Sequence, residues 1–166
     1  TNIKLADTRK TTPGLRIFEK YAFKCGGGVN HRMGLYDAAM IKENHIAWTD
    51  NLNNAVKKIR LNSPFTTHII IEAENIEQAK EAVLAGADSV LLDELSPEII
   101  KKNVQELRDL SMNSLKKEVN KNLIIEVSGI NPEEISKYLI KGIDLISTSS
   151  SITKSNWIDL SMRYIN

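Results

Sequence analysis

The sequence predicts an α/β fold in which parallel strands form an incomplete TIM-like barrel with about six or seven strands. Short runs rich in Ile, Val and Leu alternate with segments of helical apolar periodicity along most of the chain. Polar or charged residues follow each apolar run, and no glycine-rich dinucleotide motif follows the first one. With 166 residues, 42% of them hydrophobic, the chain is long enough to bury one domain-sized core.

Six segments are predicted to be strands, and helices are expected between them. The strands are residues 3–6, 38–42, 68–73, 89–92, 123–127 and 143–146. The first helix is expected to begin at Thr12-Pro13, an N-cap followed by a first-turn proline, and to end at Gly26. Four of its residues recur at helical spacing and are predicted to face the core: Leu15, Phe18, Ala22 and Cys25.

The later helices show the same spacing of apolar side chains. Their predicted inward residues are Leu52, Ala55, Val56 and Ile59, then Ile76, Ala79, Val83 and Leu84, then Ile100, Val104 and Leu107, and finally Ile135 and Leu139. Residues 157–165 fit a last strand or a helix equally well, and Trp48 and Trp157 are predicted to be packing residues. Strands alternating with helices give parallel units that close as a barrel or stay open as a wound sheet. A barrel with fewer than eight regular strands is favoured.

Composition narrows the class of protein. The formal net charge is only +1, so bulk charge gives no reason to expect nucleic acid or an anionic membrane as a partner. The single cysteine cannot form an intramolecular disulfide, which favours a reducing, cytoplasmic setting. No apolar run approaches the length of a membrane span. Because the chain opens directly on a predicted strand, we expect a preceding segment to be missing.

Charged residues gather where the predicted strands end. In a barrel these ends lie on one rim, where active sites are built. The first half of the chain offers cations: Arg9, Lys10, His31, Arg32 and Lys42. The second half offers two carboxylates at the ends of apolar runs, Glu72 and Asp93. Any one of these residues is more often an ordinary loop residue, but six polar strand ends in a row favour a site.

The residue types indicate the chemistry of that site. Arginine forks and a lysine point charge suit a ligand with more than one carboxylate or phosphate. A carboxylate ending an apolar strand is costly unless it is paired, hydrated or bound to a cation, and such acids commonly hold Mg²⁺ directly or through water. Backbone amides and hydroxyls for a phosphate are offered by Ser128, Gly129 and Ser147 to Ser151. The residues alone therefore predict a barrel that handles an anionic, phosphorylated substrate with Mg²⁺, without naming the reaction.

Three stretches resemble one enzyme family. Residues 8–16, Thr-Arg-Lys-Thr-Thr-Pro-Gly-Leu-Arg, are similar to the TRKTTPGLR segment of quinolinate phosphoribosyltransferases, also called nicotinate-nucleotide pyrophosphorylases. Residues 26–35 look like that family's GGGxxHRxGL, and residues 41–46 resemble its IKxNHI. The order and spacing match, and the resemblance continues through Glu72 and Asp93 to the C-terminus. It covers essentially the whole chain.

The resemblance implies an activity and an architecture. The implied reaction joins quinolinate to phosphoribosyl pyrophosphate and releases pyrophosphate and CO₂, giving nicotinate mononucleotide for NAD biosynthesis. Residues 1–166 would be the barrel catalytic domain, and the family's N-terminal α/β domain would be absent. In the family a homodimer places the partner's N-terminal domain over each barrel and adds an arginine to the quinolinate site. Mg²⁺ is the expected cofactor.

Roles for individual residues follow from the same resemblance. Arg9, His31, Arg32 and Lys42 would bind the two quinolinate carboxylates, next to Thr8. Phosphoribosyl pyrophosphate, its ribose hydroxyls and its Mg²⁺ would be served by Lys10, Glu72 and Asp93, and the catalytic residues would be Lys10, Lys42, Glu72 and Asp93. The 5′-phosphate would lie on loops containing Ser128, Gly129, Ser147 and Ser149.

The phosphate loops depart from the family pattern, and other functions stay open. The chain reads Ser128-Gly129-Ile130, one residue short of the usual Ser-Gly-Gly or Ser-Gly-Asn before isoleucine, and a family glycine after the sixth strand is replaced by serine at Ser149. The alternatives are a sister phosphoribosyltransferase or its molybdenum-associated homologue, a lyase using Lys42 as a Schiff-base nucleophile, and a non-catalytic barrel that binds anions. Neither departure touches the cationic cluster.

Overall fold

The computed structural model describes residues 2–48, 51–114, 122–156 and 158–165. One sheet of six parallel strands organises them, in the order β1-β6-β5-β4-β3-β2. The strands are β1 (Lys4–Ala6), β2 (Ala38–Ile41), β3 (His68–Ala73), β4 (Ser89–Asp93), β5 (Ile124–Ser128) and β6 (Leu145–Ser147). The predicted α/β class and the strand number are confirmed. The sixth strand begins two residues later than predicted.

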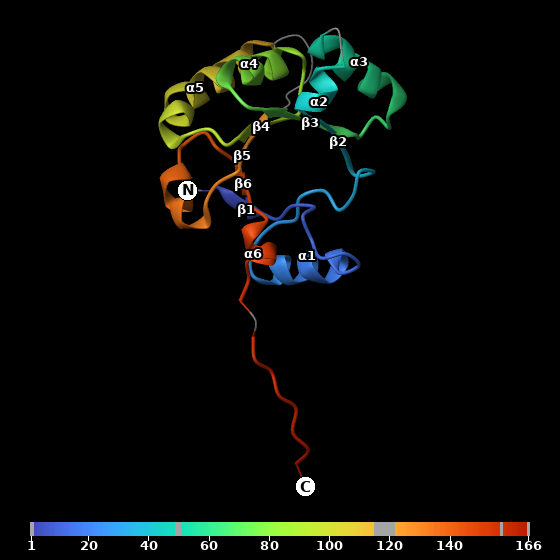
Figure 1. The fold of residues 1–166 in the computed structure, drawn as a ribbon. Helices are drawn as coiled ribbons and strands as arrows, with labels where there is room; N and C mark the ends of the chain where they lie inside the picture. Colours follow the sequence, from blue (N-terminus) through green and yellow to red (C-terminus); the bar gives the residue numbers. More distant parts are fainter. Residues whose placement is uncertain (1, 49–50, 115–121, 157, 166) are drawn as a thin grey trace.

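The sheet curves into an incomplete barrel, as Figure 1 shows. β1 and β2 are the two edges of the sheet, so hydrogen bonds between strands do not close it. The chain between α1 and β2 runs along the β1 edge, where Val29 forms a parallel bridge with Ala6. The Val29 amide donates to the Leu5 carbonyl (2.9 Å), and the Asp7 amide donates to the Val29 carbonyl (3.2 Å). This edge contact brings residues 30–32 close to the end of β1.

Helices cover the outer face of the sheet. They are α1 (Arg16–Cys25), α2 (Glu43–Ile46), α3 (Leu52–Asn62), α4 (Ile76–Leu84), α5 (Pro97–Ser114), a 3-10 helix (Pro132–Tyr138) and α6 (Ser150–Thr153). Figure 1 places α3, α4 and α5 outside the arc of strands, and α4 packs on β3, β4 and α5. Asn51 and Asn75 cap α3 and α4, because each side-chain oxygen accepts a backbone amide from the first turn (2.8 and 2.9 Å).

Alternation along the strands gives the sheet two different faces. The outward residues join the helices in the main core, which includes Ile41, Ile69, Ile71, Val90, Leu92, Ile125, Val127 and Ile146. The inward residues form a small apolar cluster of Ala38, Met40, Ile70 and Leu91. The other inward positions are mostly polar. Burying the outer face therefore fixes which side chains enter the barrel.

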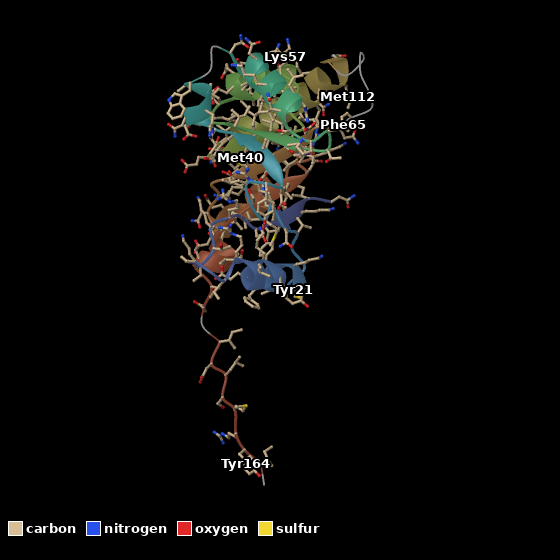
Figure 2. All side chains as sticks on the ribbon, turned by 90° about the vertical axis from the view of Figure 1, so that its right-hand side faces the viewer. Tyr21, Met40, Lys57, Phe65, Met112 and Tyr164 are labelled. Carbon is tan, nitrogen blue, oxygen red and sulfur yellow. The ribbon has the colours of Figure 1, made fainter. Side chains whose placement is uncertain are left out.

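The first helix differs from its prediction. It begins at Arg16 rather than Thr12, because residues 12–15 form a turn in which Gly14 has a φ of +79°. The residues predicted to face the core, Leu15, Phe18, Ala22 and Cys25, are exposed. Lys20 is the buried residue, and Tyr21 lies on the outward side (Figure 2). The spacing was helical, but the polar side of this helix faces the barrel because Lys20 bonds to the end of β1.

Smaller corrections concern single side chains. Leu84, Leu139 and Trp48 are exposed, contrary to their predicted packing roles. Leu139 follows a 3-10 helix that ends at Tyr138, and Tyr138 is the residue that buries its ring there. Residues 158–165 form neither a helix nor a strand and extend away from the barrel (Figure 1). Trp157 lies outside the described residues. The other predicted inward faces are confirmed.

Candidate active site

A cavity of about 320 Å³ opens at the carboxyl ends of the strands. All twelve residues selected from the sequence line it: Thr8, Arg9, Lys10, His31, Arg32, Lys42, Glu72, Asp93, Ser128, Gly129, Ser147 and Ser149. Seven further residues line it as well: Met40, Leu91, Glu94, Glu126, Ile130, Thr148 and Ser150. The predicted residues are therefore brought together, whereas their individual roles stay predictions.

Strand register sets the depth of each side chain in this cavity. Glu72 on β3 is in register with Leu91 on β4, and Leu91 is in register with Glu126 on β5. Asp93 and Ser128 form the next inward row, nearer the rim. Glu126 is thus one row deeper than Asp93. Met40 and Leu91 are apolar members of an otherwise mostly polar lining, and a mixture of apolar and polar groups is typical of sites for small molecules.

The loop after β1 carries the first three site residues and is held by α1. The Thr8 hydroxyl accepts the Lys10 amide (3.0 Å). The Arg16 guanidinium on α1 donates to the Arg9 carbonyl (3.2 Å) and to the Met33 carbonyl (3.3 Å). The Nε of Arg9 is buried and has no hydrogen-bond partner among the described residues. An anionic ligand that accepts a hydrogen bond from this buried N–H would stabilise it.

A buried ion pair ties this loop to the next one. Lys20 on α1 and Asp7 at the end of β1 are 1% and 0% exposed and form a salt bridge. Asp7 also accepts the side-chain amide of Asn30 (2.6 Å) and the backbone amide of His31 (2.8 Å). The three donors satisfy a carboxylate that would otherwise be costly to bury. Asp7 therefore fixes where His31 and Arg32 enter the cavity.

Both ring nitrogens of His31 have partners. The Arg32 amide donates to Nδ1 (2.8 Å), and Nε2 lies 3.2 Å from the Oε2 of Glu126. Glu126 is 1% exposed, and its Oε1 has no partner among the described residues. Sequence reasoning had not selected Glu126. The available signal was a charge inside the apolar run Ile-Ile-Glu-Val, at an inward strand position.

Arg32 is held by the edge strand β2. Its Nη1 donates to the Ala38 carbonyl (2.7 Å), and its Nη2 lies 3.5 Å from the Met40 sulfur. Burial and the neighbouring charge of Arg9 lower the pKa of Arg32, and Asp37 opposes them by raising it. An anion bound in the cavity would offset the repulsion between these two guanidinium groups. The pair suits planar carboxylates, which an arginine fork binds through two parallel hydrogen bonds.

Lys42 and Glu72 connect the cationic and acidic parts of the site. The Lys42 Nζ is 2.5 Å from the Glu72 Oε2, and the side chains are 43% and 11% exposed. Burial raises the pKa of Glu72, Lys42 lowers it through a hydrogen bond and its charge, and Asp93 raises it through like-charge repulsion. Glu72 and Asp93 are therefore close enough for their charges to interact. A shared cation would relieve that repulsion.

The last loops offer hydroxyls and a backbone turn. The Ser128 hydroxyl donates to Asp93, and the Ser150 amide donates to the Thr148 hydroxyl (3.1 Å). Gly129 has a φ of +72°, and a Cβ there would lie 2.5 Å from the Glu94 Cγ. A side chain at this position would strain the backbone and would require Glu94 to shift. The shortened loop thus still presents bare backbone to the cavity.

The described residues offer neither a preformed metal cluster nor a membrane-spanning helix. Among the residues that the structure describes, no group of three or more His, Cys, Asp or Glu could hold a metal ion. A cation at Glu72 and Asp93 would therefore need oxygens from a ligand or water to complete its shell. Within the described part of the chain, no helix is long and apolar enough to cross a membrane.

The chain is similar to curated proteins of one description over nearly its whole length. A probable nicotinate-nucleotide pyrophosphorylase (carboxylating) from Methanothermobacter thermautotrophicus is 42% identical over 161 residues, which are 96% of this chain and 55% of that protein. The Bacillus subtilis protein of the same description is 39% identical over 160 residues, covering 96% and 52%. The chain thus spans about half the length of the curated relatives it matches.

Solved structures of the same kind share the fold. NadC from Streptococcus pyogenes superposes with a TM-score of 0.82 at 38% identity, covering 98% of this chain and 54% of that one. The nicotinate-nucleotide pyrophosphorylase from Ehrlichia chaffeensis gives a TM-score of 0.78 at 35% identity, covering 93% and 52%. The family model of the quinolinate phosphoribosyl transferase C-terminal domain matches residues 1–163. The chain therefore belongs to the quinolinate phosphoribosyl transferase family, in the part that this C-terminal domain describes.

Proposed function

We propose that the full-length protein containing this chain transfers a phosphoribosyl group from phosphoribosyl pyrophosphate to quinolinate, with loss of CO₂. The product would be nicotinate mononucleotide, a precursor of NAD. The observation that carries the proposal is the division of one cavity into a cationic side, with Arg9 and Arg32, and an acidic side, with Glu72 and Asp93. The motif stretches and the names of the relatives support the choice of reaction.

The cationic side suits the two carboxylates of quinolinate. The Nε of Arg9 has no partner among the described residues, and burial and the charge of Arg9 lower the pKa of Arg32, so an anion that contacts both groups would be bound favourably. Lys42 is partly exposed and reaches the same cavity. We assign these three residues to orienting the carboxylates rather than to proton transfer. Fixed orientation lowers the barrier by removing the entropy cost of bringing two reactants together.

The acidic side suits the sugar and its metal. Glu72 and Asp93 project from neighbouring strands and repel each other, and carboxylates of this kind fit Mg²⁺ with water and phosphate oxygens. When bound, Mg²⁺ would neutralise charge on the pyrophosphate, together with Lys10. The 5′-phosphate is assigned to the loops that contain Ser128-Gly129 and residues 147–150. Their amides and hydroxyls are ordinary phosphate donors.

The bonds that form and break in this reaction need neither an oxidant nor a reductant. The pyridine nitrogen forms a bond to the ribosyl carbon, while the bond from that carbon to pyrophosphate breaks. Electrostatic stabilisation by Glu72 and Asp93 would support the positive charge that develops on the sugar. The bond between the ring and the 2-carboxylate then breaks, its electrons enter the pyridinium ring, and a proton replaces CO₂. The chain's own residues act by position and charge.

One rival function is disfavoured by a contact in the site. A Schiff-base mechanism needs an uncharged lysine amine as the nucleophile. The Lys42 Nζ instead lies 2.5 Å from the Glu72 Oε2, so a carboxylate already engages the nitrogen that would have to attack the substrate. Borohydride trapping with a carbonyl substrate checks the point, since a stable adduct at Lys42 would restore the lyase reading.

Product formation tests the proposal directly. Nicotinate mononucleotide is measured with quinolinate and phosphoribosyl pyrophosphate for residues 1–166 and for the full-length protein. The full-length protein is expected to form the product, and no product from it would refute the proposal.

Asp93→Asn tests the metal and sugar assignment, with Asp109→Asn on the exposed side of α5 as its control. Unchanged Mg²⁺ dependence and turnover in Asp93→Asn would remove Asp93 from that role.

A homodimer completed by an N-terminal domain, and a cytoplasmic location, stay predictions. The fold and the cavity described above are those of this chain alone. Size-exclusion chromatography with light scattering on the full-length protein measures the oligomeric state. A monomer that is fully active would exclude the expected contribution of a partner subunit.

A further inference from the structure

Glu126 has no role in the proposed reaction, yet it lines the cavity and is almost fully buried. It occupies the middle of β5 at an inward position, and only 1% of it is exposed. One carboxylate oxygen contacts His31, and the other has no partner among the described residues. A buried carboxylate oxygen without a hydrogen-bond donor costs free energy, commonly about 1–3 kcal/mol. Such an atom in a cavity wall indicates a donor that arrives with a ligand.

Two hydrogen bonds to the imidazole ring of His31 define its tautomer. The Arg32 amide donates to Nδ1, so Nδ1 must be an acceptor without a proton. Nε2 then carries the ring proton and donates it to Glu126 at 3.2 Å. With both nitrogens occupied, His31 has no N–H left for a substrate carboxylate unless Glu126 is displaced. The ring is positioned from both sides.

The charge of its surroundings limits what the free oxygen can bind. Carboxylates and phosphates of a ligand are repelled by Glu126 and are attracted to Arg9 and Arg32, which line the same cavity. A neutral donor does not meet this repulsion, and the hydroxyl group is the neutral donor of a phosphorylated sugar. Quinolinate has no hydroxyl. The sugar half of the ligand is therefore the part that fits Glu126.

We propose that Glu126 positions His31 in its Nε2–H tautomer through one carboxylate oxygen and accepts a sugar hydroxyl through the other. The sugar assignment rests on the proposed function. The tautomer assignment does not, because it follows from contacts within the chain. Glu126 is thus a residue that recognises the hydroxyl-bearing half of the ligand, separate from the cations that recognise its anionic groups.

Nitrogen-15 NMR of the histidine side chains tests the positioning role. In the full-length protein the His31 signals, assigned by their loss in His31→Gln, are expected to show a protonated Nε2 and an unprotonated Nδ1. Glu126→Gln retains an oxygen that accepts the Nε2 proton, so the tautomer should persist, whereas Glu126→Ala should give a mixture of tautomers. Glu81→Gln, an exposed site on α4, is the matched control and should change nothing. An Nδ1–H tautomer in the wild type, or no change in Glu126→Ala, overturns this part.

Binding of sugar phosphates tests the hydroxyl assignment. Ribose 5-phosphate and its 2-deoxy and 3-deoxy analogues are titrated calorimetrically against the full-length wild type, Glu126→Ala and Glu81→Gln. In the wild type, removal of one of the two hydroxyls should weaken binding by about tenfold or more, because it leaves a buried acceptor unpaired. In Glu126→Ala that difference should fall to within about threefold. Equal ratios in both proteins, or no binding of ribose 5-phosphate to the wild type, overturn the assignment.

The two proposals can fail separately. If the deoxy ratios respond to Glu126→Ala as expected but the full-length protein forms no nicotinate mononucleotide, the reaction is wrong and the contact of Glu126 with a sugar hydroxyl stands as a binding contact alone. If the product forms and the deoxy ratios do not respond to Glu126→Ala, the reaction stands and the role of Glu126 is wrong. Glu126→Gln keeps the size of the side chain and its contact with His31. It therefore shows whether an altered ratio of dissociation constants between the deoxy analogues and ribose 5-phosphate in Glu126→Ala comes from a disturbed fold.

Discussion

Replacing Arg32 with lysine separates the charge of this residue from its shape. In the structure, the two terminal nitrogens of Arg32 contact the Ala38 carbonyl and the Met40 sulfur on β2. These contacts fix the plane of the guanidinium, and its remaining N–H groups are left for a ligand. A lysine ammonium carries the same charge but cannot bond to Ala38 and also offer two parallel donors to a carboxylate.

The size of the effect follows from the contacts that are lost. A hydrogen bond to a charged group contributes about 1.5–3 kcal/mol, so losing one arm of a bidentate contact should weaken quinolinate binding by roughly 10- to 150-fold. Arg32→Ala removes the charge as well and should weaken binding further. Arg60→Lys is a matched control, because Arg60 also bonds to a backbone carbonyl, that of Thr67 (2.8 Å), but does not line the cavity.

Isothermal titration of quinolinate into the full-length variants measures this difference. Arg60→Lys is expected to lower stability and to leave the dissociation constant within twofold of the wild type. An Arg32→Lys dissociation constant within twofold of the wild type would refute the reasoning, because charge alone would then account for the binding. Equal losses in Arg32→Lys and Arg60→Lys would refute it as well, since they would indicate a general loss of folding.

Three further predictions concern stability and the phosphate loop. Burial raises the pKa of Glu72, so the contribution of this group to stability is largest below its ordinary pKa of 4.5 and is lost as the pH rises through the folded pKa. In thermal denaturation, Glu72→Gln should therefore unfold at a higher temperature than the wild type at pH 7 and lose this advantage near pH 4. Lys20→Met should cost about 3–5 kcal/mol in urea denaturation, since it leaves the buried charge of Asp7 unpaired, and Lys20→Met with Asp7→Asn should recover part of the loss. Gly129→Ala should raise the KM for phosphoribosyl pyrophosphate and lower the free energy of unfolding by about 1 kcal/mol or more, because alanine strains the positive φ and contacts Glu94. A KM within twofold of the wild type would exclude this backbone from the phosphate site.

The strands and the strand-end residues could be predicted from the sequence for a simple reason. An apolar run flanked by polar residues marks a buried strand, and the carboxyl ends of parallel strands must meet at one edge. Glu72 and Asp93 are therefore placed in one cavity by the pattern alone. The identity of the ligand could not be read in this way. It required the motif stretches around Arg9, Arg32 and Lys42.

The first helix shows where periodicity stops being informative. Its apolar spacing fits a helix, and a helix of this region is present. Periodicity indicates that one side is apolar, but not which neighbour that side meets. Here Lys20 and Arg16 on the polar side bond to Asp7 and to the loop of Arg9, and these contacts determine the orientation. The apolar side, with Phe18 71% exposed, is turned away from the described barrel.

Glu126 was missed for a related reason. Strand-end reasoning selects charged residues at the last position of an apolar run, and Glu126 lies two positions before the end of β5. Inward and outward positions alternate, so a charge there enters the cavity as surely as one at the rim. A search for charged residues at any inward position of a strand would have found it.

Two side-chain contacts join the basic residues of the site to its carboxylates, the Lys42–Glu72 ion pair and the His31–Glu126 hydrogen bond, and they differ in their exposure to solvent. Lys42 is 43% exposed, so solvent reaches its ammonium group and a substrate carboxylate can compete with Glu72 for it. The contact between His31 and Glu126 is more buried, with side chains 11% and 2% exposed, so solvent screens it less. A ligand that carries carboxylates on one side and hydroxyls on the other can displace the first pair and add to the second. A ligand with anions on both sides meets Glu126 and is repelled. The arrangement therefore selects a combination of ligand groups, which a cluster of cations alone would not do.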